Sequence, residues 1–323
     1  MTDEMRAYGL GEYALLLLLA ALWGASYPLI KIALESIPPI TLMAVRVSLA
    51  AAMLCAIACY RGLHFPRDGS TWRAFLVQAF FNSIGAWTLL AWGQQFVDSG
   101  LAGVLNSTSP VFVFFLTLTW TRHENVGFPR LVGAMLGLLG VVFIVGVNAL
   151  SGLGDDTVAQ LAILTGALLY ACAAIYGKRF SHLPSVVSAA GTMMWASLVL
   201  IPAALLMERP WTLTIHPRSA GAAAALAIFS TAVALLIYFR LARTIGSMGV
   251  ASQSYLRSAI AVAFGVVFLD EPLTHGLAVG ATFIIAGMIL INLTPAGLGR
   301  RAGPATPRGR EGGRPPRYLR AGS

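Results

Sequence analysis

The chain has 323 residues, of which 57% are hydrophobic and 11% are charged, and its formal net charge is +9. Its mean hydropathy is +0.76. Water-soluble domains carry roughly 25% charged residues, so this chain has too few charges to cover a water-facing surface. The apolar residues also stand in long runs, which excludes a soluble globular enzyme and a disordered protein. We therefore expect a polytopic, all-α integral membrane protein whose surroundings are the lipid bilayer.

Ten apolar runs are long enough to cross a bilayer core of about 30 Å, for which a helix needs roughly 20 residues. They cover residues 12–34, 40–60, 72–92, 100–120, 130–147, 158–177, 185–206, 219–240, 248–269 and 275–293. A short segment, 1–11, precedes the first run. Residues 294–323 follow the last run and are rich in Gly, Pro and Arg, which predicts a disordered tail.

Most lysines and arginines between the runs fall on one side of the membrane. That side receives Arg6, Arg61, Arg67, Arg73, Arg122, Arg130, Lys178, Arg179, Arg240, Arg243 and the tail arginines. The opposite side receives only Arg209 and Arg218. By the positive-inside rule both termini are expected in the cytoplasm, as an even number of spans requires. No aromatic stacking series accompanies the tail arginines, so we expect them to lie near anionic headgroups and not to bind nucleic acid.

The second half of the chain repeats the first at an offset of 147 residues. This offset carries Leu22 onto Leu169, Lys31 onto Lys178, Ser83 onto Ser230, Ser107 onto Ser254, Glu124 onto Glu271, Gly133 onto Gly280 and Gly140 onto Gly287. Each half, 12–147 and 158–293, holds five spans, and residues 148–157 form an external linker. Because five is odd, the second copy enters the membrane upside down. We therefore expect ten transmembrane helices as two inverted five-helix repeats, a construction typical of secondary transporters.

Motifs in three of the runs resemble a known family. They are Leu22-Trp23-Gly24-Ala25-Ser26-Tyr27-Pro28-Leu29-Ile30-Lys31; Ser109-Pro110-Val111-Phe112 leading to Glu124; and Ser254-Tyr255-Leu256 with Phe268-Leu269-Asp270-Glu271-Pro272-Leu273. Their order and spacing over residues 10–295 resemble the EamA-type branch of the drug/metabolite transporter superfamily. The resemblance implies a ten-helix inner-membrane carrier that exports amino acids, related metabolites or toxic compounds, and it leaves the substrate open.

Apart from Arg73, Arg130 and Arg240 at the very ends of their runs, three basic residues lie inside predicted spans, where a charge costs roughly 2.5–3.5 kcal/mol on insertion scales. Lys31 is near the outer end of its run and is expected to extend to the interface toward Glu35. Arg46 either holds a structural partner, such as a helix-terminal carbonyl, or contacts substrate. Arg257 lies roughly 15 Å deep at 1.5 Å per residue, where it either binds an anionic substrate group or bonds to carbonyls. It occupies the repeat position of Pro110, where the family places proline.

The deep interior of the runs contains no acidic residue, and the first run has none between Tyr13 and Leu34. Small drug antiporters of the same superfamily use a glutamate in the first helix to exchange protons for cationic drugs. The sequence therefore favours facilitated export over a carboxylate-driven antiport.

The first, third and fourth helices and their inverted mates face the cavity in the family fold. With Arg46 and Arg257, the side chains expected to bind substrate are Trp23, Ser26, Tyr27, Asn82, Trp87, Asn106, Ser109, Tyr170, Tyr176, Tyr238, Gln253 and Tyr255. Asn106 and Gln253 are repeat mates, and they either bond a polar substrate or bond each other. The aromatic residues either recognise substrate or pack.

Five residues interrupt the predicted helices and are expected to act as hinges or to free carbonyls beside the cavity. They are Gly24, Pro28, Gly85, Pro110 and Gly265. Small-residue faces at Gly133 with Gly137 and at Gly276 with Gly280 let helices approach closely. Packing within a monomer is the expectation for these faces, and a homodimer is the alternative.

Signals of catalysis and of a cofactor are missing from the sequence. Cys55, Cys59 and Cys172 are interpreted as buried packing thiols and not as metal ligands, because no histidine shares their runs. We therefore predict a secondary transporter with no cofactor or metal that exports small carboxylate-bearing metabolites such as amino acids. Export of hydrophobic drugs is the alternative within transport, and a membrane-embedded enzyme or a helical scaffold is the alternative outside it.

Overall fold

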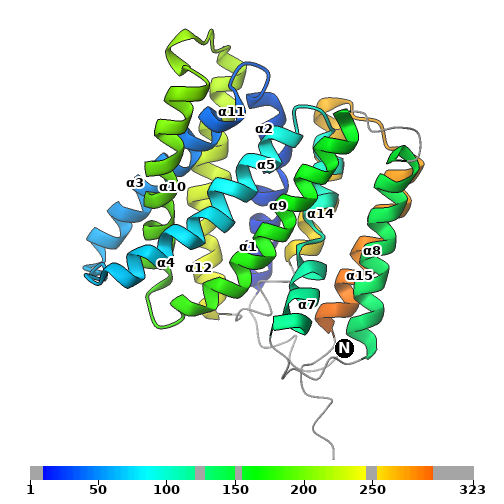
Figure 1. Ribbon diagram of the computed structural model, residues 1–323, viewed down its shortest axis with the longest axis horizontal. Coiled ribbons are helices and arrows are strands. Elements are labelled where there is room, and N and C mark those ends of the chain that lie inside the picture. The colour runs from blue at the N-terminus through cyan, green and yellow to red at the C-terminus, as the bar shows by residue number, and fades with distance from the viewer. Residues whose placement is uncertain (1–9, 121–127, 150–154, 245–252, 294–323) are drawn as a thin grey trace, which may run out of the picture.

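The computed structural model describes residues 10–120, 128–149, 155–244 and 253–293, which form helices and their connections without a strand (Figure 1). The predicted tail, Glu124 and residues 150–154 of the predicted linker lie outside these described residues.

Helices follow the predicted runs closely in both halves. The first half contains α1 (Leu10–Gly24), α2 (Ser26–Ala33), α3 (Pro39–Tyr60), α4 (Gly69–Ala79), the π-helix η2 (Phe80–Gly85), α5 (Ala86–Gly93), α6 (Ser99–Asn106), α7 (Ser109–Trp120) and α8 (Phe128–Ala149). The second half contains α9 (Asp155–Gly177), the 3₁₀ turn η3 (Lys178–Phe180), α10 (Ser185–Met207), η4 (Pro210–Thr212), α11 (Pro217–Ala227), the π-helix η5 (Ile228–Val233), α12 (Ala234–Thr244), α14 (Gln253–Leu269) and α15 (His275–Leu293). Thus α9 begins at Asp155, inside the predicted linker.

Seven stretches of the described chain are long and apolar enough to cross a bilayer. They are Gly11–Ala33, Pro39–Tyr60, Gly69–Gly93, Ser99–Leu116, Thr157–Phe180, Ser185–Met207 and Pro217–Tyr238. Three shorter apolar helices, Leu131–Gly140, Leu256–Leu269 and His275–Gly287, coincide with the other three predicted runs. Seven of the ten predicted spans are thus long and apolar enough to cross a bilayer. The count of ten stays a prediction.

Two π-helices lie at corresponding places of the two halves. The first, η2, interrupts the third predicted span, and η5 interrupts the eighth. Each holds a buried serine, Ser83 or Ser230, and these two serines are repeat mates. Single π-turns inside α-helices are uncommon and occur frequently at functional sites. The halves also differ, because the first span is divided into α1 and α2 at Ala25 whereas its mate α9 is continuous.

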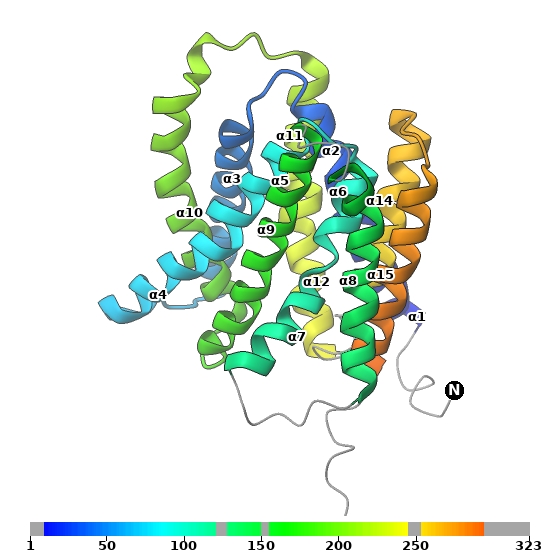
Figure 2. The same cartoon turned by 45° about the vertical axis from the view of Figure 1, so that its right-hand side comes forward.

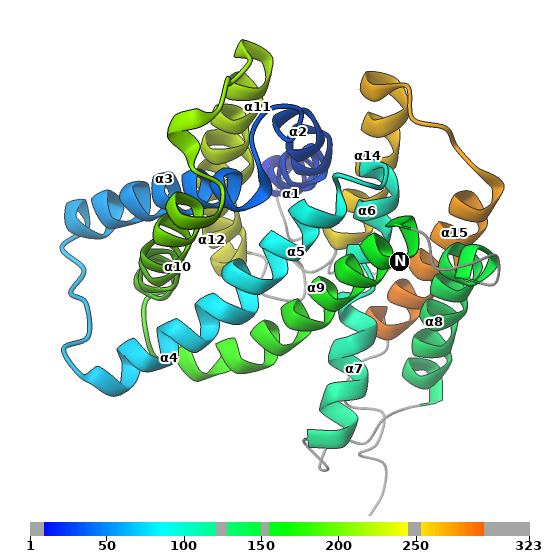
Figure 3. The same ribbon diagram turned by 45° about the horizontal axis from the view of Figure 1, so that its top comes forward.

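Two pairs of helices form the flanks of the molecule. Helices α3 and α10 lie side by side on one flank, and α8 and α15 lie side by side on the other (Figures 1, 2 and 3). The first, third, fourth, sixth, eighth and ninth predicted spans stand between them. Helix α1 begins and α15 ends at the same end of the molecule (Figure 1). The central helices are therefore enclosed on both sides.

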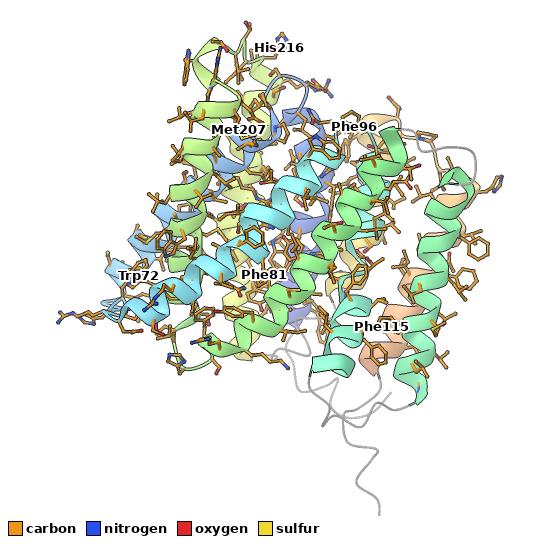
Figure 4. The ribbon with its side chains drawn as sticks, viewed as in Figure 1. Trp72, Phe81, Phe96, Phe115, Met207 and His216 are labelled. Carbon is orange, nitrogen blue, oxygen red and sulfur yellow. The ribbon has the colours of Figure 1, made fainter. Side chains whose placement is uncertain are left out.

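Large apolar side chains cover the outer surface, as lipid contact requires. On α10, Leu198, Leu206 and Met207 are exposed, and Met207 is labelled in Figure 4. The prediction of three buried thiols is wrong, because Cys59 is exposed and Cys55 and Cys172 are only half-buried. A thiol on a lipid-facing helix surface needs no protein contact, so apolar surroundings in the sequence did not imply burial.

Candidate functional site

A cavity of about 260 Å³ lies among the central helices, between the two halves of the chain. Its lining residues come from α1, α2, α3, η2, α5 and α6 of the first half and from α9, α12 and α14 of the second. They are Trp23, Ser26, Tyr27, Arg46, Asn82, Leu90, Asn106, Tyr170, Leu235, Tyr238 and Arg257. All of them except Leu90 and Leu235 belong to the set chosen from sequence, although α3 was not among the helices expected to face the cavity.

Arg46 reaches the cavity wall from α3 and is held by two neighbours. Its Nε donates a hydrogen bond of 2.9 Å to Oγ1 of Thr231 in η5, and its guanidinium carbon lies 4.0 Å from the centroid of the Trp87 ring. The residue is buried. Of the two interpretations made from sequence, a structural partner is present, although that partner is a hydroxyl and an aromatic ring and not a helix-terminal carbonyl.

Arg257 reaches the same cavity from α14 but is less well satisfied. Its Nε is buried and has no hydrogen-bond partner within the described part of the chain. No carboxylate stands among the residues that line the cavity. A buried guanidinium group is expected to find an anionic or carbonyl partner. The cavity thus carries two cations, and one of them has hydrogen-bonding capacity to spare.

Amide and aromatic groups complete the wall. Asn106 donates from Nδ2 to the Tyr27 hydroxyl at 2.8 Å, so it pairs with Tyr27 in the described structure. The Gln253 side chain, its predicted repeat partner, lies outside the described side chains. The rings of Trp23 and Tyr238 are tilted, with centroids 5.6 Å apart. The wall therefore offers aromatic faces beside the two arginines.

Several predicted site residues lie elsewhere. Trp87 is buried behind the wall, where its Nε1 donates to the Tyr170 hydroxyl. Ser109 Oγ donates to the Ala167 carbonyl at 2.8 Å, which joins α7 to α9. Tyr176 lines a separate groove. The Tyr255 side chain, like that of Gln253, is outside the described side chains.

The predicted hinge residues have a packing role in the structure. A Cβ atom at Gly24 would lie 2.7 Å from Ile260 Cγ2, and one at Gly85 would lie 2.6 Å from Leu169 Cδ1. Gly265 packs directly against the Glu271 carboxylate. Pro28 and Pro110 each lie in the first turn of a helix, α2 and α7, and neither can donate an N–H to the carbonyl four residues earlier. Breaks after Gly24 and before Ser109 agree with interrupted helices, and hinge motion stays a prediction.

Lys31 was expected to extend toward Glu35, and this choice of partner is wrong. Its Nζ donates to the carbonyl oxygens of Gln94 at 2.9 Å and Val97 at 2.7 Å, where α5 ends. Glu35 instead lies 3.5 Å from Arg218 in an exposed ion pair. The last carbonyls of a helix have no partner within it and attract a cation. Proximity in sequence thus misled the choice of partner.

Glutamates cap two helices of the first half from the second half, and the sequence reasoning missed both contacts. Glu271 accepts from the backbone N–H groups of Ser99 at 2.6 Å and Gly100 at 2.9 Å, at the start of α6. Glu208 accepts from those of Ile40 at 2.9 Å and Thr41 at 2.6 Å, at the start of α3. Their position just beyond an apolar run was the available signal.

Both halves of the chain match one family. The matched segments are residues 11–146 and 157–293, and the family is described as the EamA-like transporter family. The chain belongs to the EamA-like transporter family. These boundaries lie within one residue of the predicted repeats, 12–147 and 158–293.

Relatives in this family include proteins from bacteria and archaea. The chain is 28% identical over 287 residues to the uncharacterized inner membrane transporter YedA of Escherichia coli K12, covering 87% of this chain and 90% of YedA. It is 22% identical over 274 residues to the uncharacterized transporter YoaV of Bacillus subtilis, with 84% and 94% covered. An uncharacterized transporter of Archaeoglobus fulgidus is 27% identical over 287 residues, with 86% and 96% covered. The chain is thus a multi-pass membrane protein similar to transporters over nearly its whole length.

A solved crystal structure shares the fold of this EamA-like chain. It matches with a TM-score of 0.62 at 20% sequence identity, covering 85% of this chain and 94% of the other. At that identity the likeness concerns the fold alone.

Proposed function

We propose that this member of the EamA-like family is a secondary transporter that exports small carboxylate-bearing metabolites, such as amino acids, by alternating access. The observation that carries the proposal is the central cavity, which Arg46 and Arg257 both line without a carboxylate among the described lining residues. A guanidinium group in a low-dielectric site favours an anionic ligand, and its planar fork matches a carboxylate.

The proposed topology has ten spans in two inverted repeats, with both termini in the cytoplasm of an inner membrane. The matched segments support two repeats. The distribution of basic residues supports the orientation. Inverted repeats place the substrate between the halves, and rocking of one half against the other opens the site to each side in turn.

The size of the cavity favours a small metabolite over a bulky compound. Sites for drug-sized ligands measure roughly 300–1,000 Å³, and the cavity here measures about 260 Å³. Export of hydrophobic compounds is the second candidate, favoured by the aromatic wall of Trp23, Tyr27, Tyr170 and Tyr238. The described lining contains no His, Cys, Asp or Glu, and its groups able to transfer a proton are the tyrosines Tyr27, Tyr170 and Tyr238. Because no carboxylate or imidazole in that lining could activate these hydroxyls, the wall favours binding over catalysis.

The mode of transport follows from the same charges. Without an acid between Tyr13 and Leu34 of the first span or among the described lining residues, a carboxylate-driven exchange of protons for cations is disfavoured. We propose facilitated export down the substrate gradient, with a monomer as the transporting unit.

Counterflow in proteoliposomes tests the proposal. The labelled panel contains a neutral, an aromatic and an acidic amino acid and one cationic drug, and Arg257→Gln is compared with the parent protein. We expect flux of carboxylate-bearing substrates that falls at least tenfold in the variant, because one charge-assisted contact contributes about 1.5–3 kcal/mol. Arg61→Gln, at an exposed arginine outside the cavity, is the matched control and should transport normally. Flux of the cation alone, unchanged by Arg257→Gln, would refute the anion site.

A further inference from the structure

A second hollow lies beside α9, apart from the central cavity. It measures about 290 Å³ and is lined by Phe81, Leu116, Cys172, Ile175, Tyr176 and Arg179. Phe81 belongs to η2 and Leu116 to α7, and Figure 4 shows Phe81 beside α9. Arg179 is the one charged residue among these lining residues, which are otherwise apolar or aromatic.

This groove faces the membrane and not the central cavity. Cys172, Tyr176 and Arg179 are spaced by three and four residues and therefore share one face of the helix. That face continues the stripe of Leu161 and Leu168, which are 48% and 37% exposed. Tyr170, which lines the central cavity, is turned to the opposite face of α9. The groove consequently opens toward lipid.

Aromatic packing fixes the cation at the rim. The turn η3 carries Arg179 between Lys178 and Phe180, and Phe180 is buried with its ring centroid 5.0 Å from that of Phe75. The guanidinium carbon of Arg179 lies 5.9 Å from the centroid of the Tyr176 ring. Neither ion pair found in the described part of the chain involves Arg179. Within the described part of the chain, an exposed cation is thus held over an apolar groove without an ion-pair partner.

The surrounding charge is positive. Arg67, Arg73 and Lys178 are exposed, and the start of α4 lies near η3 because Trp72 packs in one cluster with Phe180. The nearby acid, Asp68, caps α4 by accepting from the Thr71 amide at 2.7 Å. Hydrogen bonds from the Thr71 side chain and backbone lower the pKa of the Asp68 carboxyl. Among the described residues around the groove, one carboxylate committed to a helix cap leaves the basic side chains in excess.

We propose that the groove between η2, α7 and α9 binds an anionic phospholipid of the cytoplasmic leaflet. An acyl chain lies against Phe81, Leu116 and Ile175, and the phosphate accepts hydrogen bonds from Arg179. The cytoplasmic leaflet carries anionic lipids, and basic pockets between membrane helices on that side hold their headgroups. The proposal rests on the orientation given above and is independent of the transported substrate. It assigns Tyr176 to lipid contact.

Native mass spectrometry of the full-length protein tests the site. The protein is purified in mild detergent and incubated with phosphatidylglycerol or with phosphatidylcholine of the same acyl chains. We expect retention of phosphatidylglycerol over phosphatidylcholine. Arg179→Gln should reduce phosphatidylglycerol retention about fivefold, the factor that one cation near an anionic surface contributes. It should leave phosphatidylcholine unchanged. Arg61→Gln, at the end of α3, is the matched control and should retain both lipids as the parent does.

A steric variant tests the acyl-chain part of the site separately. Leu116→Trp fills the groove without changing charge, so retention of both lipids should fall together, with thermal unfolding measured to verify the fold. Equal retention of phosphatidylglycerol by the parent and Arg179→Gln would overturn the proposal. Displacement of the lipid by millimolar inorganic phosphate would also overturn it, because it would indicate a site for free anions. Formation of a dimer in place of the lipid adduct would overturn it as well.

Discussion

Gly140 of α8 faces the backbone carbonyl of Gly280 on α15, and the same contact recurs between Gly287 and the carbonyl of Gly133. A Cβ atom at Gly140 would lie 2.7 Å from the Gly280 oxygen. Gly140 and Gly287 are repeat mates, as are Gly133 and Gly280. The repeat offset therefore maps the contact of Gly140 with Gly280 onto the contact of Gly287 with Gly133. A two-fold axis relates self-complementary surfaces in the same way. The glycine faces seen in the sequence thus join the ends of the two halves within one chain.

Alanine at either of these glycines should separate α8 from α15. The added methyl group has no space beside a carbonyl of the facing helix. Overpacking a tight interface costs about 1–3 kcal/mol, so Gly140→Ala and Gly287→Ala should each lower the thermal unfolding midpoint in detergent. Gly276→Ala on α15 is the control, because its Cβ would meet only the Phe143 carbonyl at an ordinary 3.7 Å. Equal midpoints for all three variants would contradict this interface.

Arg46 joins three elements through one guanidinium group. It extends from α3 to Thr231 in η5 and to Trp87 in α5. We predict that Arg46→Met lowers the unfolding free energy by about 2 kcal/mol, because a desolvated cation–π contact and a charge-assisted hydrogen bond are both lost. Arg218→Met removes an arginine whose side chain is 63% exposed, and should change stability little.

A transport readout separates support from recognition at Arg46. Arg46→Lys keeps the charge but cannot reproduce the planar fork. If Arg46 only supports the wall, the folded Arg46→Lys protein should show an unchanged KM and a lowered midpoint. A raised KM for acidic substrates and no change for the cationic drug would instead make Arg46 a second anion contact.

Lys31 closes the end of α5 and should contribute to stability more than its interfacial position suggests. Lys31→Met leaves the carbonyls of Gln94 and Val97 without their cation. The loss should be about 1 kcal/mol, reduced from the value for a charge-assisted hydrogen bond because Lys31 is only partly buried. Its repeat mate Lys178 is exposed, and Lys178→Met should leave the unfolding midpoint near that of the parent.

The sequence predicted the helices, the repeats and most of the cavity wall because those features depend on periodic apolar runs and on polar residues within them. It did not predict which groups meet across the bundle. Lys31 and Glu208 find partners 63 and 168 residues away in the chain. Tyr176 failed as a cavity residue for another reason. It lies on the same predicted span as Tyr170, but on the opposite helix face, and a hydrophobic span shows little amphipathic pattern from which to orient that face.

Glu271 should matter as a helix cap. Glu271→Gln keeps the shape of the side chain but removes the charge that favours the start of α6. It also replaces one of the two accepting oxygens by an NH2 group, so the N–H of Ser99 or of Gly100 loses its acceptor. We therefore expect a loss of about 1–3 kcal/mol. Glu208→Gln should behave alike at α3. Gly265→Ala should reproduce the defect, because its methyl group would occupy the space of the Glu271 carboxylate. Glu35→Gln, at an exposed acid, is the control, and an equal loss there would show a general charge effect.

The pair of Tyr27 and Asn106 offers the sharpest separation of structure from recognition. Both side chains are nearly fully buried, and they share one hydrogen bond of 2.8 Å in the cavity wall. Tyr27→Phe leaves the Asn106 amide without its acceptor, which should lower stability by about 1–3 kcal/mol. The double variant Tyr27→Phe/Asn106→Leu removes both polar groups and should recover part of that loss. If the pair only supports the wall, transport by the double variant should recover with stability. If the amide also binds substrate, thermal stability should return while KM for polar substrates stays raised. The reason is that the double variant has lost both the Tyr27 hydroxyl and the Asn106 amide from the cavity wall.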